Sequence, residues 1–184
     1  MDKSFSNFQK SPLKLYIQDI FRANRSHENK YIYEIFGMSF KNIMIHGVIT
    51  CVYNKTGATT NLELSDPTGT VQVYYDSTKH NLNVPNDKLK FLHRDFATQY
   101  RFGDDNMDIK LKMLDAISST KQNVLNFEEG NYASIIGDIF IDDIRNIRMV
   151  SAYQCEVTTI ERDIVWLEEL RYLYEKFYLW YKVE

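Results

Sequence analysis

The fold is decided by the stretch NIMIHGVITCVYNKTGATTNLELSDPTGTVQVYYDS, residues 42–77. In its first part, apolar residues recur at nearly regular two-residue spacing, at Ile43, Ile45, Ile49 and Val52. The alternation slips in phase just after Gly47, where a glycine can host a bulge or a sharp bend. This pattern predicts one long bent strand, which a small closed barrel requires.

The second part of the stretch contains a strong reversal signal, Asp66-Pro67-Thr68-Gly69. The proline presets φ, the aspartate can accept hydrogen bonds from the backbone amides ahead of it, and the glycine tolerates a positive φ. The turn is flanked by alternating apolar residues, Leu62 and Leu64 before it and Val71 and Val73 after it. A hairpin that follows the bent strand is therefore expected.

Two more strands are expected after residue 130. Residues 130–139 again place a glycine, Gly137, in mid-strand, and residues 149–157 alternate in the same way. Five strands with two glycine bends predict a mainly β chain with added helices: a five-stranded OB-fold barrel with a C-terminal interface helix. OB-folds usually bind single-stranded nucleic acid or other OB-folds.

The remaining segments are assigned by composition and periodicity. Residues 1–12 are expected to form a flexible tail, and residues 13–184 a single OB-fold domain. Within that domain, residues 13–21 have helical spacing, and residues 31–36 are expected to form an extra strand leading into the barrel. Residues 78–129 are expected to hold an inter-strand helix plus an insertion, with helices near residues 89–100 and 107–117.

Composition narrows the class of protein. The net charge of −3 gives no basic excess of the kind that nonspecific phosphate binding uses, so protein partners weigh more than DNA. Cys51 and Cys155 fit no metal-ligand spacing and are expected to be buried free thiols in a reducing, intracellular compartment. No signal peptide and no long apolar run points to a membrane.

The expected C-terminal helix, residues 160–182, is apolar almost all round. One stripe contains Ile164, Leu167, Leu170, Tyr174, Phe177 and Tyr181. Trp166, Leu173 and Trp180 lie beside this stripe. A small barrel that already has a core cannot cover this whole surface, so the outer side is predicted to be a protein interface. The alternative is that the stripe packs only on its own barrel.

Several anchors in this order resemble a known family. They are Lys14-Leu15-Tyr16-Ile17-x-Asp19-Ile20, the Gly47 strand, Asp66-x-Thr68-Gly69, residues 130–139 and Leu173-Tyr174-x-Lys176-Phe177-Tyr178. Over residues 13–178 the chain resembles the Stn-type subunit of the CST telomere complex, which is similar to the middle subunit of replication protein A. The alternative is a general single-strand-binding subunit like that replication subunit.

The resemblance implies a set of partners and a location. The C-terminal helix would pair with a small Ten-type OB-fold subunit, and the pair would dock on a large scaffold subunit. The partner-facing residues would be Leu167, Leu170, Leu173, Tyr174, Phe177, Tyr178 and Tyr181. The implied roles are overhang protection, C-strand fill-in and telomere length regulation at the chromosome ends in the nucleus, and contacts with polymerase alpha-primase and telomerase stay open.

Direct DNA binding by this subunit is expected to be weak. Where family members commonly have a tryptophan and an Arg-x-Tyr segment, this chain has Asp76 and Phe140-Ile141-Asp142, and carboxylates repel phosphate. The candidate nucleic-acid residues are Lys41, Tyr53, Lys55, Tyr74, Phe140, Arg145 and Arg148. The alternative is that they are surface tyrosines and solvated cations. DNA affinity would then come mainly from the assembled complex.

An enzyme is the competing class. His27, His46, His80 and His93 show no HExxH or other ligand spacing, and no P-loop or dinucleotide turn is present. The neighbouring carboxylates Asp142-Asp143 and Glu168-Glu169 are more typical of solvated surface than of a hydrolase. No catalytic residue, metal site or cofactor is therefore expected.

Overall fold

The computed structural model describes residues 8–56, 59–77, 90–92, 94–95, 98, 108–114, 127–142 and 144–179. The chain divides into two compact units, one built from Met1–Lys79 and Phe127–Glu184 and the other from His80–Asn126. In the second unit, residues 90–92, 94–95, 98 and 108–114 are helical and fall inside the two helices expected there. The rest of the expected insertion lies outside the described residues.

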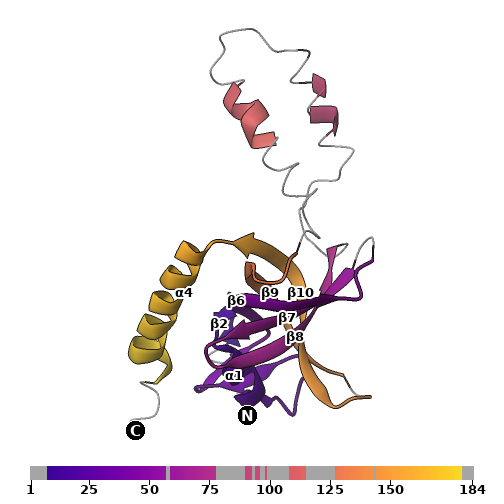
Figure 1. Ribbon diagram of the computed structural model, residues 1–184. Coiled ribbons are helices and arrows are strands. Elements are labelled where there is room, and N and C mark those ends of the chain that lie inside the picture. The colour runs from indigo at the N-terminus through magenta and orange to yellow at the C-terminus, as the bar shows by residue number, and fades with distance from the viewer. Residues whose placement is uncertain are drawn as a thin grey trace. The chain divides into compact units, whose positions relative to one another are not determined.

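The first unit is built on a closed five-stranded barrel (Figure 1). Its strands are β6 (Asn42–Tyr53), β7 (Thr59–Asp66), β8 (Gly69–Asp76), β9 (Tyr132–Asp142) and β10 (Ile147–Thr158). The strands pair in the order β6-β7-β8-β10-β9, and a further β6–β9 pairing closes the barrel. The β8–β10 pair is parallel and the others are antiparallel. The sequence-based expectation of a five-stranded OB-fold barrel is confirmed.

Two glycines let the barrel strands approach each other closely. A Cβ atom on Gly47 would lie 2.2 Å from the carbonyl oxygen of Ser65, and one on Gly137 would lie 2.4 Å from that of Ser151. Neither distance is possible for a real side chain, so both positions require glycine. The phase slip expected after Gly47 is a bulge between Ile49 and Cys51 in the β6–β7 register.

The Asp66 turn does more than reverse the chain. Asp66 Oδ1 accepts hydrogen bonds from the Thr68 and Gly69 backbone amides, at 2.7 and 3.0 Å. Its Oδ2 accepts one from the backbone amide of Ile17 at 2.8 Å, and Thr68 Oγ1 accepts one from Gln18 at 3.1 Å. The turn therefore supplies acceptors for the first amides of helix α1, Ile17–Arg22.

These contacts explain a correction near the N-terminus. The helix expected over residues 13–21 begins at Ile17, because that is where the Asp66 turn supplies the capping acceptors. The residues before it form strand β2, Leu13–Lys14, which pairs in parallel with the free edge of β6. Leu13 and Leu15 are buried there, so their apolar character reflects packing on the barrel rather than a helix face.

A second, small sheet lies N-terminal to the barrel. It contains β1 (Phe8–Gln9), β3 (Asn24–Arg25), β4 (Tyr33–Ile35) and β5 (Met38–Phe40), in the order β1-β5-β4-β3. The strand expected over residues 31–36 is present as β4, but it pairs in this sheet and not in the barrel. The expected tail also needs correction, because Phe8–Gln9 pairs in parallel with β5.

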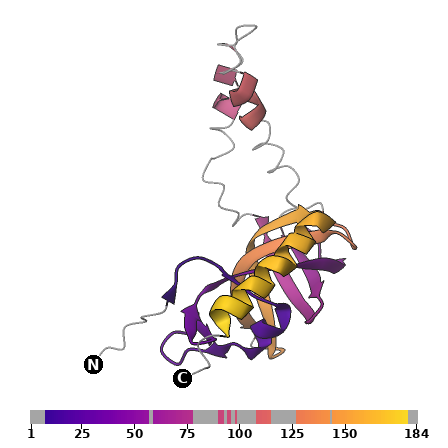
Figure 2. The same cartoon turned by 90° about the vertical axis from the view of Figure 1, so that its left-hand side faces the viewer.

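The C-terminal helix begins at Ile160, after the extended residue Thr159. Helix α4 (Ile160–Leu173) continues into a π-helical turn, η2 (Tyr174–Tyr178), in which the Leu179 amide donates to the Tyr174 carbonyl. Figure 2 shows the helix lying along one side of the barrel. Residues 180–182 of the expected helix lie outside the described residues.

Both cysteines are free: Cys51 in β6 is partly exposed, whereas Cys155 in β10 is buried. Burial raises the pKa of the Cys155 thiol well above its ordinary value. Within the part of the chain that the structure describes, no helix is both long enough and apolar enough to span a membrane.

Candidate partner and nucleic-acid interfaces

One face of the C-terminal helix packs on the chain itself. Trp166 and Leu170 of α4 are almost fully buried, and so is Tyr178 of η2. The assignment of Leu170 and Tyr178 to a partner-facing surface therefore needs correction, because the chain's own residues cover both side chains. A helix that is apolar all round gives the sequence no signal for which face turns inward.

Polar contacts fix this inner face to the N-terminal segment. The Tyr174 hydroxyl donates to Asp19 Oδ2 at 2.5 Å and accepts from the Tyr16 amide at 3.2 Å. The Tyr178 hydroxyl donates to the Lys14 carbonyl at 3.1 Å. Burial, followed by the Asp19 hydrogen bond, raises the pKa of Tyr174, and burial raises the pKa of Tyr178 to about 12. Tyr174 is thus committed to its own chain.

A salt bridge adds to the same attachment. Lys14 Nζ lies 2.8 Å from Glu169 Oε2 of α4 and also lies over the Trp166 ring, 5.4 Å from its centroid. Arg162 approaches the same carboxylate at 3.3 Å. The Lys14 hydrogen bond lowers the pKa of Glu169. The N-terminal and C-terminal motifs that carried the family resemblance therefore contact each other, which accounts for their residue types.

An aromatic contact completes the attachment at the helix end. Phe36 occupies the turn between β4 and β5 with a φ of 54°, a backbone conformation that bulky residues rarely adopt. Its ring stacks on Tyr178, with centroids 5.4 Å apart and planes 12° apart, and it meets Tyr174 edge-on. Apart from the turn residue Gly37, no feature of the sequence pointed to this contact.

His46 holds the start of α4. Its Nδ1 lies 2.9 Å from Ser134 Oγ and its Nε2 lies 3.3 Å from Asp163 Oδ1, while the ring faces Trp166 at 5.8 Å. The residue types are those of a hydrolase triad, but His46 is buried beneath the helix and Ser134 is nearly so. Burial lowers the pKa of His46, against the opposing effect of Asp163. We interpret this group as a structural contact between barrel and helix.

Several large apolar side chains of the helix are exposed, interspersed with exposed charged residues. Ile164 is 60% exposed and Phe177 is 52% exposed. Other large apolar residues exposed there are Ile160, Val165, Tyr172 and Leu179. Leu167 and Leu173 are partly buried, and Tyr181 lies outside the described residues. Among the described members of the expected partner-binding set, Phe177 is exposed, whereas Leu170 and Tyr178 are buried and the others are partly buried.

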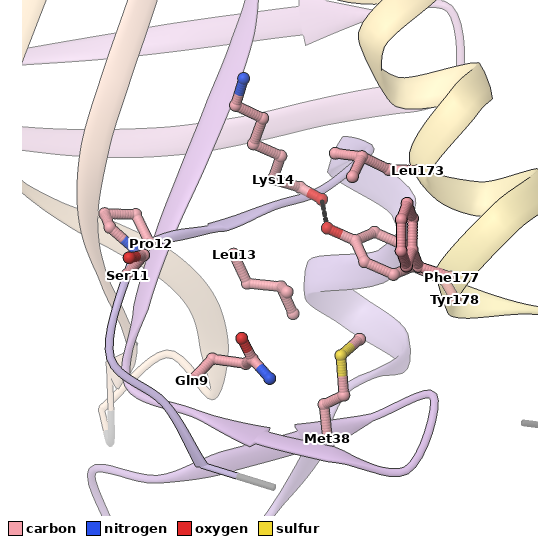
Figure 3. A pocket seen from close by; sticks show the side chains of 9 residues that line it. All are labelled: Gln9, Ser11, Pro12, Leu13, Lys14, Met38, Leu173, Phe177 and Tyr178. Carbon is pink, nitrogen blue, oxygen red and sulfur yellow. Dashed lines mark hydrogen bonds between the residues drawn. The ribbon is translucent and has the colours of Figure 1, made fainter.

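A groove of about 450 Å³ borders the C-terminal end of the helix (Figure 3). Its walls come from the segment before α1, from Met38 of β5, and from the helix end. The lining residues are Gln9, Ser11, Pro12, Leu13, Lys14, Met38, Leu173, Phe177 and Tyr178. The groove is therefore mainly apolar and continues the exposed surface around Phe177.

Two of the candidate nucleic-acid residues lie on one outer face of the barrel. Tyr53 of β6 is in register with Asn61 of β7, and Asn61 is in register with Tyr74 of β8. The inward residues Leu62 and Val73 alternate with them and are fully buried. Both tyrosine side chains are partly exposed. The two rings are thus separated by one strand, a spacing of roughly 10 Å at ordinary inter-strand distances.

The other candidates are more scattered. Lys55 follows β6 and is exposed, Arg145 is exposed in the β9–β10 turn, and Phe140 of β9 is partly exposed. Lys41 lies 3.9 Å from Asp138, which partly neutralises it, and Arg145 lies at the same distance from Asp142.

Arg148 has a structural role instead of an open position. Its guanidinium donates to the Ile20 and Ala23 carbonyls at the end of α1, at 2.6 and 2.8 Å, and lies over the Tyr33 ring. These contacts satisfy carbonyls that a helix end otherwise leaves without partners. The assignment of Arg148 to nucleic-acid binding is therefore corrected: its charge is directed inward, towards the small sheet.

Carboxylates dominate the outer barrel surface near the two tyrosines. Glu63 is in register with Gln72, Asp76 with Thr59, and Asp138 with both Asn42 and Ser151. Asp142 turns one oxygen to the backbone amides of its own turn. These carboxylates would repel phosphate groups, and the weak direct DNA binding expected from the sequence stays a prediction.

Comparisons with known proteins agree with the fold. No protein-family model and no curated protein matches the sequence. A chain from the crystal structure of the S. pombe Stn1–Ten1 complex is similar, with a TM-score of 0.53, 17% identity, and coverage of 89% of this chain and 90% of that one. A chain of a replication protein A heterotrimer bound to single-stranded DNA is also similar, with a TM-score of 0.52, 10% identity, and coverage of 87% of this chain and 91% of that one.

A third similar structure contains yeast Stn1 and Ten1, with a TM-score of 0.50, 15% identity, and coverage of 87% of this chain and 70% of that one. At these identities the likeness establishes a shared fold and no more. The resemblance inferred from the sequence is thus confirmed at that level: this chain has the OB fold seen in Stn1 complexes and in replication protein A.

Proposed function

We propose that this chain is a noncatalytic OB-fold subunit that pairs with a small OB-fold protein through the outer side of its C-terminal helix. One observation carries the proposal: the helix is firmly held by its inner face, yet it exposes Ile164, Tyr172 and Phe177 to solvent. Large exposed apolar patches on a soluble protein mark interaction sites, and aromatic residues dominate interface energies. The groove beside Phe177 gives that surface a recess.

The finer proposal is a CST-type role. The pair would dock on a large scaffold subunit at telomeres in the nucleus and support overhang protection, C-strand fill-in and telomere length regulation. Contacts with polymerase alpha-primase and telomerase belong to the same proposal. Its support is the order of sequence anchors together with the shared fold of a chain from the Stn1–Ten1 complex.

A second candidate is a general single-strand-binding subunit of the replication type. The observation that favours it is the shared fold with a chain of the replication protein A heterotrimer, of which 91% is covered. The two candidates differ in ligand preference. A general subunit holds mixed-sequence single strands, whereas a telomeric one favours the G-rich strand or needs its partners.

The helix proposal is tested by co-expression with small OB-fold proteins of the same organism. Ile164→Glu combined with Phe177→Glu places two charges on the outer side and is expected to abolish co-purification, because unpaired buried charge is costly. The matched control is Ile144→Glu with Ile147→Glu, since Ile144 is 96% exposed in the β9–β10 turn. Equal loss in both doubles, or loss in neither, contradicts the proposal.

A further inference from the structure

The N-terminal part of this chain has a positive net charge. Residues 1–41 contain seven Lys and Arg against four Asp and Glu, a net charge of +3, whereas the whole chain has a net charge of −3. The remaining residues therefore carry −6. Because the outer face of the barrel is acidic, the part of the molecule suited to phosphate lies elsewhere.

Three of these basic residues lie between the end of α1 and the start of β4. Arg22 ends α1, Arg25 lies in β3, and Lys30 lies in the turn between β3 and β4. All three side chains are exposed, and two exposed rings accompany them, Phe21 and Tyr31, of which Tyr31 is 59% exposed. We call these five residues, Phe21, Arg22, Arg25, Lys30 and Tyr31, the hairpin patch.

Local hydrogen bonds hold the hairpin patch in place. Arg25 Nε donates to the Lys30 carbonyl at 3.0 Å, and Lys30 Nζ lies 5.0 Å from the centroid of the Tyr31 ring. The Tyr31 amide donates to Asn29 Oδ1 at 2.9 Å. The Ser26 amide also donates across the turn to the Ile32 carbonyl. A cation and a ring are therefore presented together from an ordered turn.

Three carboxylates lie near the three cations of the patch, but two of them, Glu28 and Glu34, are exposed, whereas the third, Asp19, is not. Asp19 is buried and lies 3.3 Å from Arg22, with its other oxygen taken by Tyr174. Glu28 lies in the turn, and Glu34 of β4 is in register with Asn24. The barrel strands, in comparison, carry the carboxylates Glu63, Asp76, Asp138 and Asp142.

We propose that the hairpin patch binds single-stranded nucleic acid, with its cations contacting phosphates and Tyr31 stacking on a base. The inference rests on the single-strand association in the proposed function and moves the main contact from the barrel face to the small sheet. Exposed rings beside cations favour this ligand over an acidic protein, because bases stack on aromatic side chains while phosphates need the charge. An acidic protein would need the cations alone.

The test is fluorescence anisotropy of a labelled mixed-sequence oligonucleotide with the full chain at about 50 mM salt, where phosphate contacts are strong. The triple variant Arg22→Gln, Arg25→Gln and Lys30→Gln removes three charges from the patch. The matched control, Lys41→Gln, Lys55→Gln and Arg145→Gln, removes three from the barrel. Both triples are checked for folding by circular dichroism.

The patch triple is expected to weaken binding about tenfold or more. It should also reduce the slope of log affinity against log salt by about 2, because each of the three lost phosphate contacts contributes about 0.7 to that slope. The barrel triple is expected to stay within about twofold of the parent chain. Tyr31→Ser leaves every charge in place and is expected to weaken binding about fivefold or more through lost stacking. This single variant keeps the test decisive if the patch triple unfolds.

Three outcomes overturn the inference. A larger loss in the barrel triple would keep single-strand association but return it to the barrel. Full competition by poly-glutamate, with no effect of Tyr31→Ser, would make the patch a surface for acidic protein. Absence of any binding at low salt would remove single-strand association by this chain itself, while pairing through α4 is judged separately by the co-expression experiment.

Discussion

Removing one hydroxyl group tests how the C-terminal helix is held. Tyr174→Phe keeps the ring, and with it the contacts to Phe36 and Tyr178, but deletes the hydrogen bond to Asp19 and the acceptor of the Tyr16 amide. Asp19 is 1% exposed, so water cannot replace the lost donor without opening the packing.

The size of the effect follows from these contacts. A hydrogen bond to a charged group contributes about 1.5–3 kcal/mol, and the orphaned Tyr16 amide is only partly buried, so the expected loss in unfolding free energy is about 2–3 kcal/mol. For a chain of this size each kcal/mol corresponds to roughly 2–4 °C, so the melting temperature should fall by about 5–10 °C. The effect is independent of any partner.

The assay is urea unfolding of the parent, of Tyr174→Phe, of Asp19→Asn and of the double variant. The expected coupling between the two substitutions is about 1–2 kcal/mol, because each removes a partner of the same bond. Tyr172→Phe is the matched control on the exposed side and should change stability by less than about 0.5 kcal/mol. Equal effects of the Tyr172 and Tyr174 changes, or strict additivity with Asp19→Asn, would refute the attachment described above.

Further predictions concern the barrel and its contacts. Gly47→Ala is expected to cost about 3 kcal/mol in urea unfolding because its Cβ has no room, whereas Gly69→Ala, whose nearest neighbour lies at 3.8 Å, should stay within about 1 kcal/mol. Burial lowers the pKa of His46 in the folded state below 6.5, so the stability that the neutral ring contributes is complete above that pH and is lost as the pH falls below it. His46→Gln should therefore flatten the pH dependence of the unfolding free energy between about pH 7.5 and 5.5. An unchanged slope would contradict this role of His46. Arg148→Met should cost about 1.5–3 kcal/mol in stability, by thermal and urea unfolding, and leave oligonucleotide affinity unchanged within about twofold.

The barrel was predictable because its signals are local. Gly47 and Gly137 interrupt the apolar alternation at the two places where strands approach too closely for a side chain. The turn at Asp66 is formed by four consecutive residues whose types are typical of turns. Long strands of 8 to 12 residues also give alternation enough length to be recognised.

Apart from β4, the strands of the N-terminal sheet were not predicted, for the opposite reason. Its strands have two or three residues, too few for any period to emerge. The start of α1 at Ile17 is set by Asp66, 49 positions away, and so is invisible in the local pattern. From the sequence alone, Arg148 looks like a surface cation, because the α1 carbonyls that it contacts are far from it in the chain.

The candidate interfaces were predicted only in outline. The apolar composition of residues 160–178 indicated a helix with more than one buried face. Leu170 and Phe177 look alike in sequence, yet Leu170 is buried in the structure and Phe177 is 52% exposed. What separates them is the position of His46, Asp19 and Lys14 on the barrel side, which is tertiary information. The basic hairpin was missed because its cations are spread over nine residues and balanced by acids elsewhere in the chain.

The central claim is that the outer side of α4 forms an interface with another OB-fold protein. The most direct measurement is the mass, by light scattering after size-exclusion chromatography, of the particle formed when this chain is co-expressed with a small OB-fold protein of the same organism. We expect a one-to-one heterodimer with the parent chain and a lone monomer with Ile164→Glu and Phe177→Glu. A heterodimer that persists unchanged in this double variant would contradict the claim.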